Sequence, residues 1–205
     1  MYELTDFKPS GVSEKKTQIV LTDTKRDVKN YIQSLRYRYN KKNPYLPHYV
    51  ISKRGEVFKI MEPNMYSYFL ENEKNDKKSI IISLENFGCL KKNPLQESYV
   101  SWIGDIYKKK AFERKWRDCF FWDKYEKKQL ETMGKLILEL CDKFEIPKIS
   151  IGHNVRQDGV ENFKGVATRS NYDVSYKDVN PAFDFKFLEK ILNDDKWIWR
   201  NKKPT

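Results

Sequence analysis

The chain has 205 residues, of which 39% are hydrophobic and 15% aromatic; this supports a globular core and excludes a largely disordered protein. Its net charge of +11 favours polyanionic partners or reflects a lysine-rich coding bias. The lysines are scattered rather than gathered into one stripe, so a nucleic-acid surface is not favoured. No apolar run approaches the roughly 18 residues that a membrane span requires.

The cysteines and the first residues indicate the chemistry of the thiols and the compartment of synthesis. Cys89, Cys119 and Cys141 are odd in number and widely spaced, which argues against both a disulfide scaffold and a zinc ribbon. Cys141 lies in an apolar helical run and fits a buried core position. The first residues have neither a basic nor an apolar signal region, so we expect no signal peptide and synthesis in the cytoplasm.

The first third of the chain predicts an arm followed by a strand, a helix and a hairpin. Residues 1–16 are polar and form the arm, and the β-branched run 18–21 reads as a buried strand. Apolar residues at helical spacing predict a helix over residues 28–39, which nearby prolines end. Residues 48–60 predict a hairpin with Gly55 in its turn.

The middle of the chain alternates irregular and regular segments. Residues 62–78 read as a loop, and the nearly continuous apolar run 79–84 as a strand buried on both faces. Residues 95–121 are aromatic and charged without a clear period, which indicates an insertion. Over residues 125–144 the apolar positions keep helical spacing and predict a long amphipathic helix.

The C-terminal part predicts one more strand and one more helix. Residues 149–151 read as a short strand, 154–177 as a long polar loop, and 184–192 as a terminal helix before the tail 193–205. The order of elements predicts an α/β fold with a central mixed β-sheet flanked by helices, in a single domain over residues 17–192 that carries the insertion.

Four sequence motifs occur in a characteristic order along the chain: Gln18–Thr24 (QIVLTDT), residues 47–58 (PHYVISKRGEVF), Ser79–Gly88 (SIIISLENFG), and Gly152-His153 with Asp178–Phe185 (DVNPAFDF). In this order they resemble the N-acetylmuramoyl-L-alanine amidase family, which includes the peptidoglycan recognition proteins. The family's usual forms are His-His-Thr at the end of the first segment, Tyr-His-Tyr-Val-Ile in the second, Ser-Ile-Gly-Ile-Glu-Leu in the third, and Gly-His with Asp-Pro-Gly-Pro-x-Phe-Asp-Trp in the last. The resemblance implies the same α/β fold and a peptidoglycan or cell-wall partner.

The resemblance also implies a Zn²⁺ site in an active member, held by two histidines and a Cys or Asp with one position open for water. Carried over by motif, these positions are Thr22, His153 and Asp178. A threonine hydroxyl is a poor zinc ligand, so Asp23 is the candidate replacement. Because neighbouring strand residues face opposite sides of a sheet, Asp23 reaches the metal only if the strand end is kinked. We expect zinc if the site is active and no cofactor otherwise.

The same residues also have structural explanations. A lone histidine that closes a strand, such as His153, often serves packing, and Asp178 fits a cap for the turn at Pro181. His48, in the hairpin, is expected to be structural.

The remaining catalytic positions of the family also differ here. The resemblance places a catalytic glutamate where this chain has Ser83, and Glu85, on the same strand face, is the candidate substitute. A lysine that would stabilise an oxyanion two residues before the third ligand is replaced by Tyr176, with Lys177 beside it as the candidate. A Trp-His pair of the family is replaced by the region of Tyr66. Glu85 and Lys177 are therefore the candidate catalytic residues.

Two irregular segments are candidate binding elements. The 24 residues between His153 and Asp178 exceed the family's spacing of about ten, and they are either a surface insertion or a loop over a cleft. Arg169 and Asn171 in this loop, with Thr22, Ser83 and Tyr66, are the candidate residues for binding a glycan or stem peptide. The insertion 95–121, with Trp102, Trp116 and Trp122, is a candidate docking element for a partner protein.

Three functions follow from these observations. The first is an amidase-fold protein that recognises peptidoglycan or serves as a virion or structural component, with impaired or no zinc hydrolysis. The second is an active amidase whose zinc is held by His153, Asp178 and a displaced Asp23. The third is a polyanion-binding protein that uses the basic charge. The lysine- and asparagine-rich composition fits a phage-encoded protein, found in a virion or released at lysis.

Overall fold

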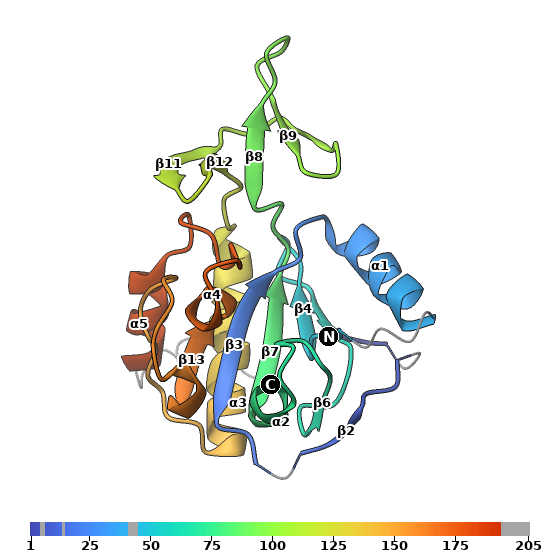
Figure 1. Ribbon diagram of the computed structural model, residues 1–205, viewed down its shortest axis with the longest axis vertical. Coiled ribbons are helices and arrows are strands. Elements are labelled where there is room, and N and C mark those ends of the chain that lie inside the picture. Colours follow the sequence, from blue (N-terminus) through green and yellow to red (C-terminus); the bar gives the residue numbers. More distant parts are fainter. Residues whose placement is uncertain (5–6, 14, 41–44, 194–205) are drawn as a thin grey trace, which may run out of the picture.

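A six-stranded mixed sheet forms the centre of the protein, in a computed structural model that describes residues 1–4, 7–13, 15–40 and 45–193 (Figure 1). Its strands in spatial order are β1 (Tyr2–Glu3), β5 (Val57–Lys59), β4 (Tyr49–Ile51), β7 (Ser79–Leu84), β3 (Gln18–Asp23) and β13 (Gly165–Thr168). The strands β4, β7, β3 and β13 are parallel, and β5 runs antiparallel to β4. The predicted fold, a central mixed sheet flanked by helices, is confirmed.

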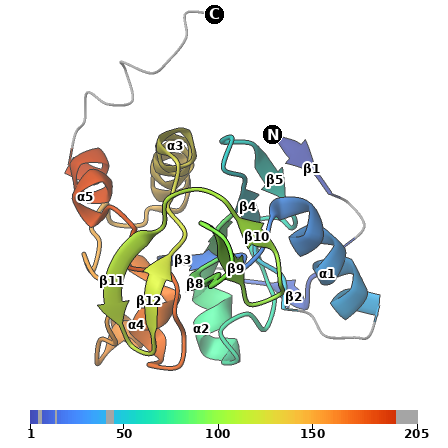
Figure 2. The ribbon, with the colours of Figure 1, turned by 90° about the horizontal axis from the view of Figure 1, so that it is seen from above.

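Helices cover both faces of this sheet, as the view from above shows (Figure 2). On one face lie α3 (Lys127–Phe144) and α5 (Phe185–Asn193), packed on Ile19, Leu21, Ile80 and Ile82. On the other face lie α1 (Val28–Asn40), α2 (Glu73–Lys78) and the short α4 (Arg169–Tyr172). Successive strand residues alternate between these two covered faces, which explains why β3 and β7 are apolar almost throughout. None of the described helices is long and apolar enough to span a membrane.

The insertion forms a second sheet that projects beyond the end of β7 (Figure 1). Its five antiparallel strands, in spatial order, are β10 (Ile106–Tyr107), β9 (Tyr99–Ser101), β8 (Cys89–Lys92), β12 (Cys119–Trp122) and β11 (Phe112–Trp116). The sequence predicted an aperiodic insertion over 95–121, whereas the sheet starts at Cys89 and ends at Trp122. Short strands with one exposed face and a small core around Leu90 give little apolar periodicity, which explains the missed strands.

Three other expectations from the sequence were wrong. Residues 149–151 form no strand, and only an isolated bridge joins Ser150 to Val166. The predicted loop 154–177 contains the edge strand β13, the turn η1 (Val160–Asn162) and α4. The predicted loop 62–78 contains α2 and β6 (Met65–Tyr66), which pairs with β2 (Gly11–Val12) in the N-terminal arm.

The predicted tail 193–205 lies outside the described residues except for Asn193, and the domain division stays a prediction.

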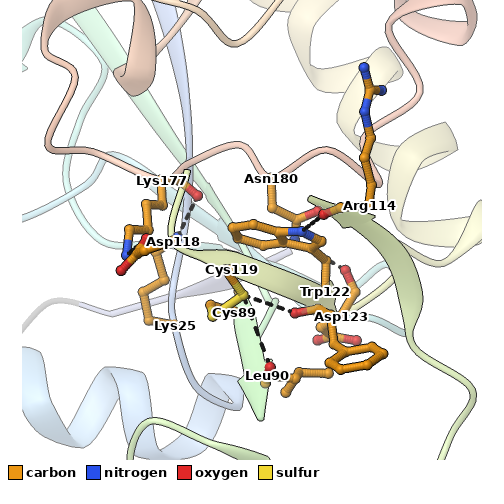
Figure 3. Close-up of a disulfide and its surroundings, with 12 residues drawn as sticks. Lys25, Cys89, Leu90, Arg114, Asp118, Cys119, Trp122, Asp123, Lys177 and Asn180 are labelled. Atoms are coloured by element: carbon orange, nitrogen blue, oxygen red, sulfur yellow. Dashed lines mark hydrogen bonds and ion pairs between the residues drawn. A yellow bond between two sulfur atoms is a disulfide. The ribbon is translucent and has the colours of Figure 1, made fainter. Parts of the chain in front are cut away.

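A disulfide joins Cys89 to Cys119, across the first and last strands of the insertion (Figure 3). The expectation that the cysteines form no disulfide scaffold therefore needs correction, because one bridge is present. The two cysteines are separated by 30 positions in the sequence, and antiparallel pairing between β8 and β12 brings them together. No sequence motif predicts this pairing. Cys141 is free and buried, as expected for a core position.

We expect replacement of both bridged cysteines by serine to destabilise the insertion by about 2 to 4 kcal/mol, because the bridge closes a loop of 30 residues. Thermal unfolding followed with and without reductant measures the effect. Reductant should lower the stability of the unsubstituted chain and leave the double variant unchanged. Equal sensitivity of both proteins would show that the bridge is not the stabilising element.

Candidate functional site

A cavity of about 670 Å³ opens at the carboxyl ends of the parallel strands, between α1 and the insertion. This edge of a parallel sheet is where α/β proteins usually bind ligands. The wall consists of basic, aromatic and a few acidic side chains: Asp23, Thr24, Lys25, Arg26, Tyr31, Ser34, Tyr37, Arg38, Tyr45, Phe69, Glu71, Trp102 and Arg169.

At one end of this cavity, two buried carboxylates surround a lysine ammonium. Lys25 Nζ lies 3.3 Å from Asp23 Oδ2 and 3.4 Å from Asp178 Oδ1, and it donates a hydrogen bond of 3.0 Å to the backbone carbonyl of Lys177. The Thr22 hydroxyl donates to the other oxygen of Asp178. Both aspartates are at least 95% buried. The positive charge of the ammonium offsets the cost of burying two carboxylates close together.

The two carboxylates titrate in opposite directions. Burial raises the pKa of Asp23 to about 7, although Lys25 and a hydrogen bond of 2.6 Å from the Tyr125 hydroxyl oppose this rise. Burial alone would also raise the pKa of Asp178, but Lys25, Arg169 and the hydrogen bond from Thr22 together hold it below its usual value. The site therefore keeps Asp178 ionised and lets Asp23 accept a proton near neutrality.

Replacement of Asp23 by Asn should stabilise the protein at pH 8, and this advantage should vanish towards pH 4. Between its unfolded pKa near 4 and its folded pKa of about 7, Asp23 binds more protons in the folded state, so its contribution to stability falls as the pH rises. The slope is about 1.4 kcal/mol per pH unit at most. Denaturant unfolding from pH 4 to 8 measures it, with the exposed Asp158→Asn as control. A stability difference that grows towards low pH would contradict the assignment.

The ends of three neighbouring strands place Ser83, Thr22 and Arg169 side by side. Thr22 is opposite Ser83 in the sheet register, and the residue before Thr22 is opposite Thr168, so Arg169 follows β13 beside Thr22. Arg169 is nine positions before Asp178, which matches the family spacing of about ten better than His153 does. The strand β13, which the sequence did not predict, thus places Arg169 beside Thr22, whereas His153 was the residue expected near it.

The histidines lie away from this cluster. The His153 side chain lines a separate cavity with Gln157, and its Nδ1 accepts a hydrogen bond of 3.3 Å from the backbone N–H of Val155. His48 is buried: its Nδ1 accepts from the Ile81 N–H at 2.9 Å, and its Nε2 lies 2.9 Å from the Met65 carbonyl. This network assigns the proton to Nε2, and burial lowers the pKa of His48 to about 3. His48 therefore has the structural role expected for it.

The other candidate residues are dispersed. The Glu85 carboxylate accepts a hydrogen bond of 2.7 Å from the Lys53 N–H, and Lys177 Nζ pairs with Asp118 of the insertion at 2.5 Å (Figure 3). The Tyr66 hydroxyl donates to Glu73, and the Asn171 amide donates to the backbone carbonyl of His153. None of these four side chains lines the cavity.

The insertion closes one side of the cavity through Trp102. The Trp102 indole N–H donates a hydrogen bond of 2.7 Å to the Lys25 carbonyl, and the Arg26 guanidinium lies 5.1 Å from the Trp102 ring centroid. Trp102 is 63% exposed, whereas Trp122 is fully buried and packs against Trp116. Only Trp102 of the three tryptophans is thus presented to the cavity, and docking of a partner protein through the insertion stays a prediction.

The sequence of the chain matches a known protein family. The sequence profile of N-acetylmuramoyl-L-alanine amidases (Amidase_2) matches residues 13–169, which is most of the chain. The chain belongs to this amidase family. No curated protein sequence matches it significantly.

Solved structures show the same fold. The amidase AmiD from E. coli, in complex with anhydro-N-acetylmuramic acid-L-Ala-D-gamma-Glu-L-Lys, matches with a TM-score of 0.57 at 14% identity over 91% of this chain, which spans 61% of that chain. The amidase LysC from Clostridium intestinale URNW matches with a TM-score of 0.57 at 12% identity, over 94% of this chain and 96% of that one. AmpDH3 from Pseudomonas aeruginosa, in complex with an anhydromuramic pentapeptide, gives 0.56 at 13% identity, over 91% and 64% of the two chains.

The residues at the zinc positions implied by the family do not fit the metal. Among the described residues, no three His, Cys, Asp or Glu side chains are grouped to hold an ion. The hydroxyl of Thr22 is committed to Asp178, Lys25 lies between the carboxylates, and His153 lines another cavity. Arg169 cannot replace a histidine ligand, because a guanidinium stays protonated and has no acceptor.

The candidate residues predicted from the sequence do not include Lys25, Arg26 or Tyr125. The signal for the first two was their position directly after a predicted buried strand, at the edge where ligands bind. Tyr125 lies just before the long helix and gave no such signal.

Proposed function

We propose that this chain is a peptidoglycan-binding member of the amidase family that does not carry out zinc-dependent hydrolysis. The observation that carries the proposal is the Lys25 ammonium, surrounded by Asp23, Asp178 and the Lys177 carbonyl at 3.0 to 3.4 Å. A cation built into the chain occupies the neighbourhood of Thr22 and Asp178, two of the positions at which the family binds a metal.

Electrostatics supports this interpretation. A divalent ion bound to Asp178 would be repelled by two cations. The Lys25 ammonium lies 3.4 Å from the Asp178 carboxylate, and the charge of Arg169 also lowers the pKa of this carboxylate. Repulsion between cations at such distances costs several kcal/mol in a partly buried site. Zinc binding would therefore require both side chains to move, and Thr22 would still be a poor ligand.

The cavity supports the proposal that the protein still binds a ligand, even without zinc-dependent hydrolysis. It retains a volume of about 670 Å³ and a wall rich in tyrosine and arginine, which suits a sugar or peptide ligand. The similar structures of AmiD and AmpDH3 contain muramyl peptide ligands. We infer a peptidoglycan fragment as the ligand class for this chain.

Two measurements on the same preparation test the proposal. Zinc content of protein purified without chelator, determined by elemental mass spectrometry, should be well below one ion per chain. Sedimentation with purified peptidoglycan from which phosphate polymers have been stripped should show binding, without release of stem peptides. An active zinc amidase from the family serves as the positive control.

The opposite results would favour the alternatives. About one zinc per chain, lost in His153→Ala, together with released stem peptides, would favour an active amidase with a displaced ligand set. Failure to bind stripped peptidoglycan would reject recognition of this polymer.

A further inference from the structure

Three guanidinium groups meet in the candidate cavity with little acidic charge to balance them. Arg26, Arg38 and Arg169 all line it, and the acidic residues of its wall are Asp23 and Glu71. Asp23 is engaged by Lys25, and the Glu71 carboxylate is 58% exposed at 3.8 Å from Arg169. The cavity therefore has an excess of positive charge from groups that cannot lose their protons.

These guanidiniums are held in place. Arg169 lies 3.8 Å from the Tyr176 ring centroid and donates 3.2 Å to the Phe69 carbonyl, while Arg26 lies over Trp102. Arg38 donates 3.2 Å to the Ser34 hydroxyl. Stacking on aromatic rings fixes the plane of a guanidinium without using its N–H donors.

The protein leaves part of their hydrogen-bonding capacity unused. The Nε donors of Arg26 and Arg169 are buried and have no acceptor within the described part of the chain. Burial and then repulsion by Arg38 lower the pKa of Arg26, so the arginines disfavour one another's charge. Bound anionic oxygens would remove this repulsion and accept the spare donors.

We propose that the cavity binds a phosphodiester-linked sugar or polyol chain, with its phosphates held by Arg26, Arg38 and Arg169 and its carbon backbone against Tyr37 and Tyr45. The inference rests on the proposed function, because it assigns an additional ligand class to the same cell-wall-binding cavity. Arginine forks match phosphate oxygens bidentately, and repeated phosphates match several guanidiniums better than one carboxylate does.

Three aromatic rings beside the arginines are already covered by guanidiniums, which argues against nucleic acid as the occupant. Single-stranded nucleic acids are held by bases that stack on aromatic rings. Here Trp102, Phe69 and Tyr176 have arginine guanidiniums over their rings. A sugar or polyol unit requires no such stacking.

Titration calorimetry with a synthetic poly(glycerol phosphate) oligomer tests the proposal, against the same polyol without phosphate, a DNA strand with equal phosphate number, and a muramyl peptide. We expect binding of the phosphate oligomer that weakens at least tenfold in Arg26→Gln and in Arg38→Gln. The exposed Arg114→Gln, which makes the same change of charge on the insertion, should leave binding unchanged. Thermal unfolding verifies that each variant is folded, and Arg38 in α1 provides a second variant if Arg26→Gln is not.

The proposal would be overturned by no binding of the phosphate oligomer, equal binding of the polyol without phosphate, equal binding of the DNA strand, or equal weakening in Arg114→Gln. Preference for the muramyl peptide with no effect of Arg26 or Arg38 would do the same. Binding of phosphate-free peptidoglycan alone would retain the proposed function and reject this inference. Binding of the phosphate oligomer alone would reject peptidoglycan recognition and retain the anion site.

Discussion

Replacement of Asp178 by Asn is expected to lower the free energy of unfolding by about 3 to 5 kcal/mol at pH 7, because it removes one partner of a buried ion pair. For a chain of this size that corresponds to a fall in Tm of roughly 6 to 20 °C. Asp178 is 3% exposed, and its carboxylate faces Lys25 at 3.4 Å, the Thr22 hydroxyl and the charge of Arg169. Asparagine keeps the shape and removes the charge that balances two cations.

The pH dependence distinguishes this charge effect from a packing defect. The pKa of Asp178 is lowered in the folded state, so its contribution to stability is present above the unfolded pKa near 4 and is lost as the pH falls through the folded pKa. The cost of Asp178→Asn should therefore shrink in acid. A cost that is independent of pH would indicate lost hydrogen bonds alone.

Two comparisons control the Asp178 experiment. Asp158→Asn alters an aspartate that is 93% exposed in the same region, and it should cost less than about 0.5 kcal/mol. Lys25→Met combined with Asp178→Asn should cost less than the sum of the two single changes, because Lys25→Met then removes a cation that has already lost one of its two carboxylates. Additive costs would show that the two side chains do not interact.

The sequence was sufficient for the elements whose residues carry strong periodicity. The apolar runs of β3 and β7 and the helical spacing of α3 were recognised because burial on a sheet face or helix stripe requires those patterns. The joint order of the motifs then led to the amidase fold, which the family comparison supports.

The edge strand β13 could not be recognised in this way. Its four residues, Gly-Val-Ala-Thr, become a strand only because β3 offers an unpaired edge for parallel pairing. Without this strand, the motif order alone led to His153 as the second candidate ligand, whereas the strand places Arg169 beside Thr22. A motif gives only the order of residues along the chain, whereas the register of the sheet determines which residues lie beside Thr22.

The charge cluster depended on contacts between distant segments. The sequence indicates Asp23 and Asp178 as candidate ligands, whereas nothing in it distinguishes Lys25 from the other lysines. Its role follows from the return of residues 177 and 178 to the end of β3, which brings two carboxylates and a carbonyl to one ammonium. Composition shows many lysines but cannot show which one is enclosed.

A rebuilt metal site should bind zinc only when the built-in cations are removed. Thr22→His and Arg169→His place two imidazoles beside Asp178, giving the two histidines and one carboxylate that suit tetrahedral zinc. If Lys25 remains, we expect binding at least tenfold weaker than in the triple variant that also carries Lys25→Ser, since the ammonium competes for both carboxylates. The triple variant should bind about one zinc per chain, and the unsubstituted protein should not.

Competition with a chromophoric chelator measures these affinities, and elemental analysis gives the stoichiometry. Adding Asp178→Asn to the triple variant should abolish binding, whereas adding His153→Ala should leave it unchanged, because His153 lines another cavity. Zinc binding that requires His153 would show that the loop carrying it closes onto the site, and Arg169 would then not occupy the second ligand position. Equal affinity with and without Lys25 would show that this ammonium does not stand in for the metal, and the electrostatic basis of the proposed function would fail with it.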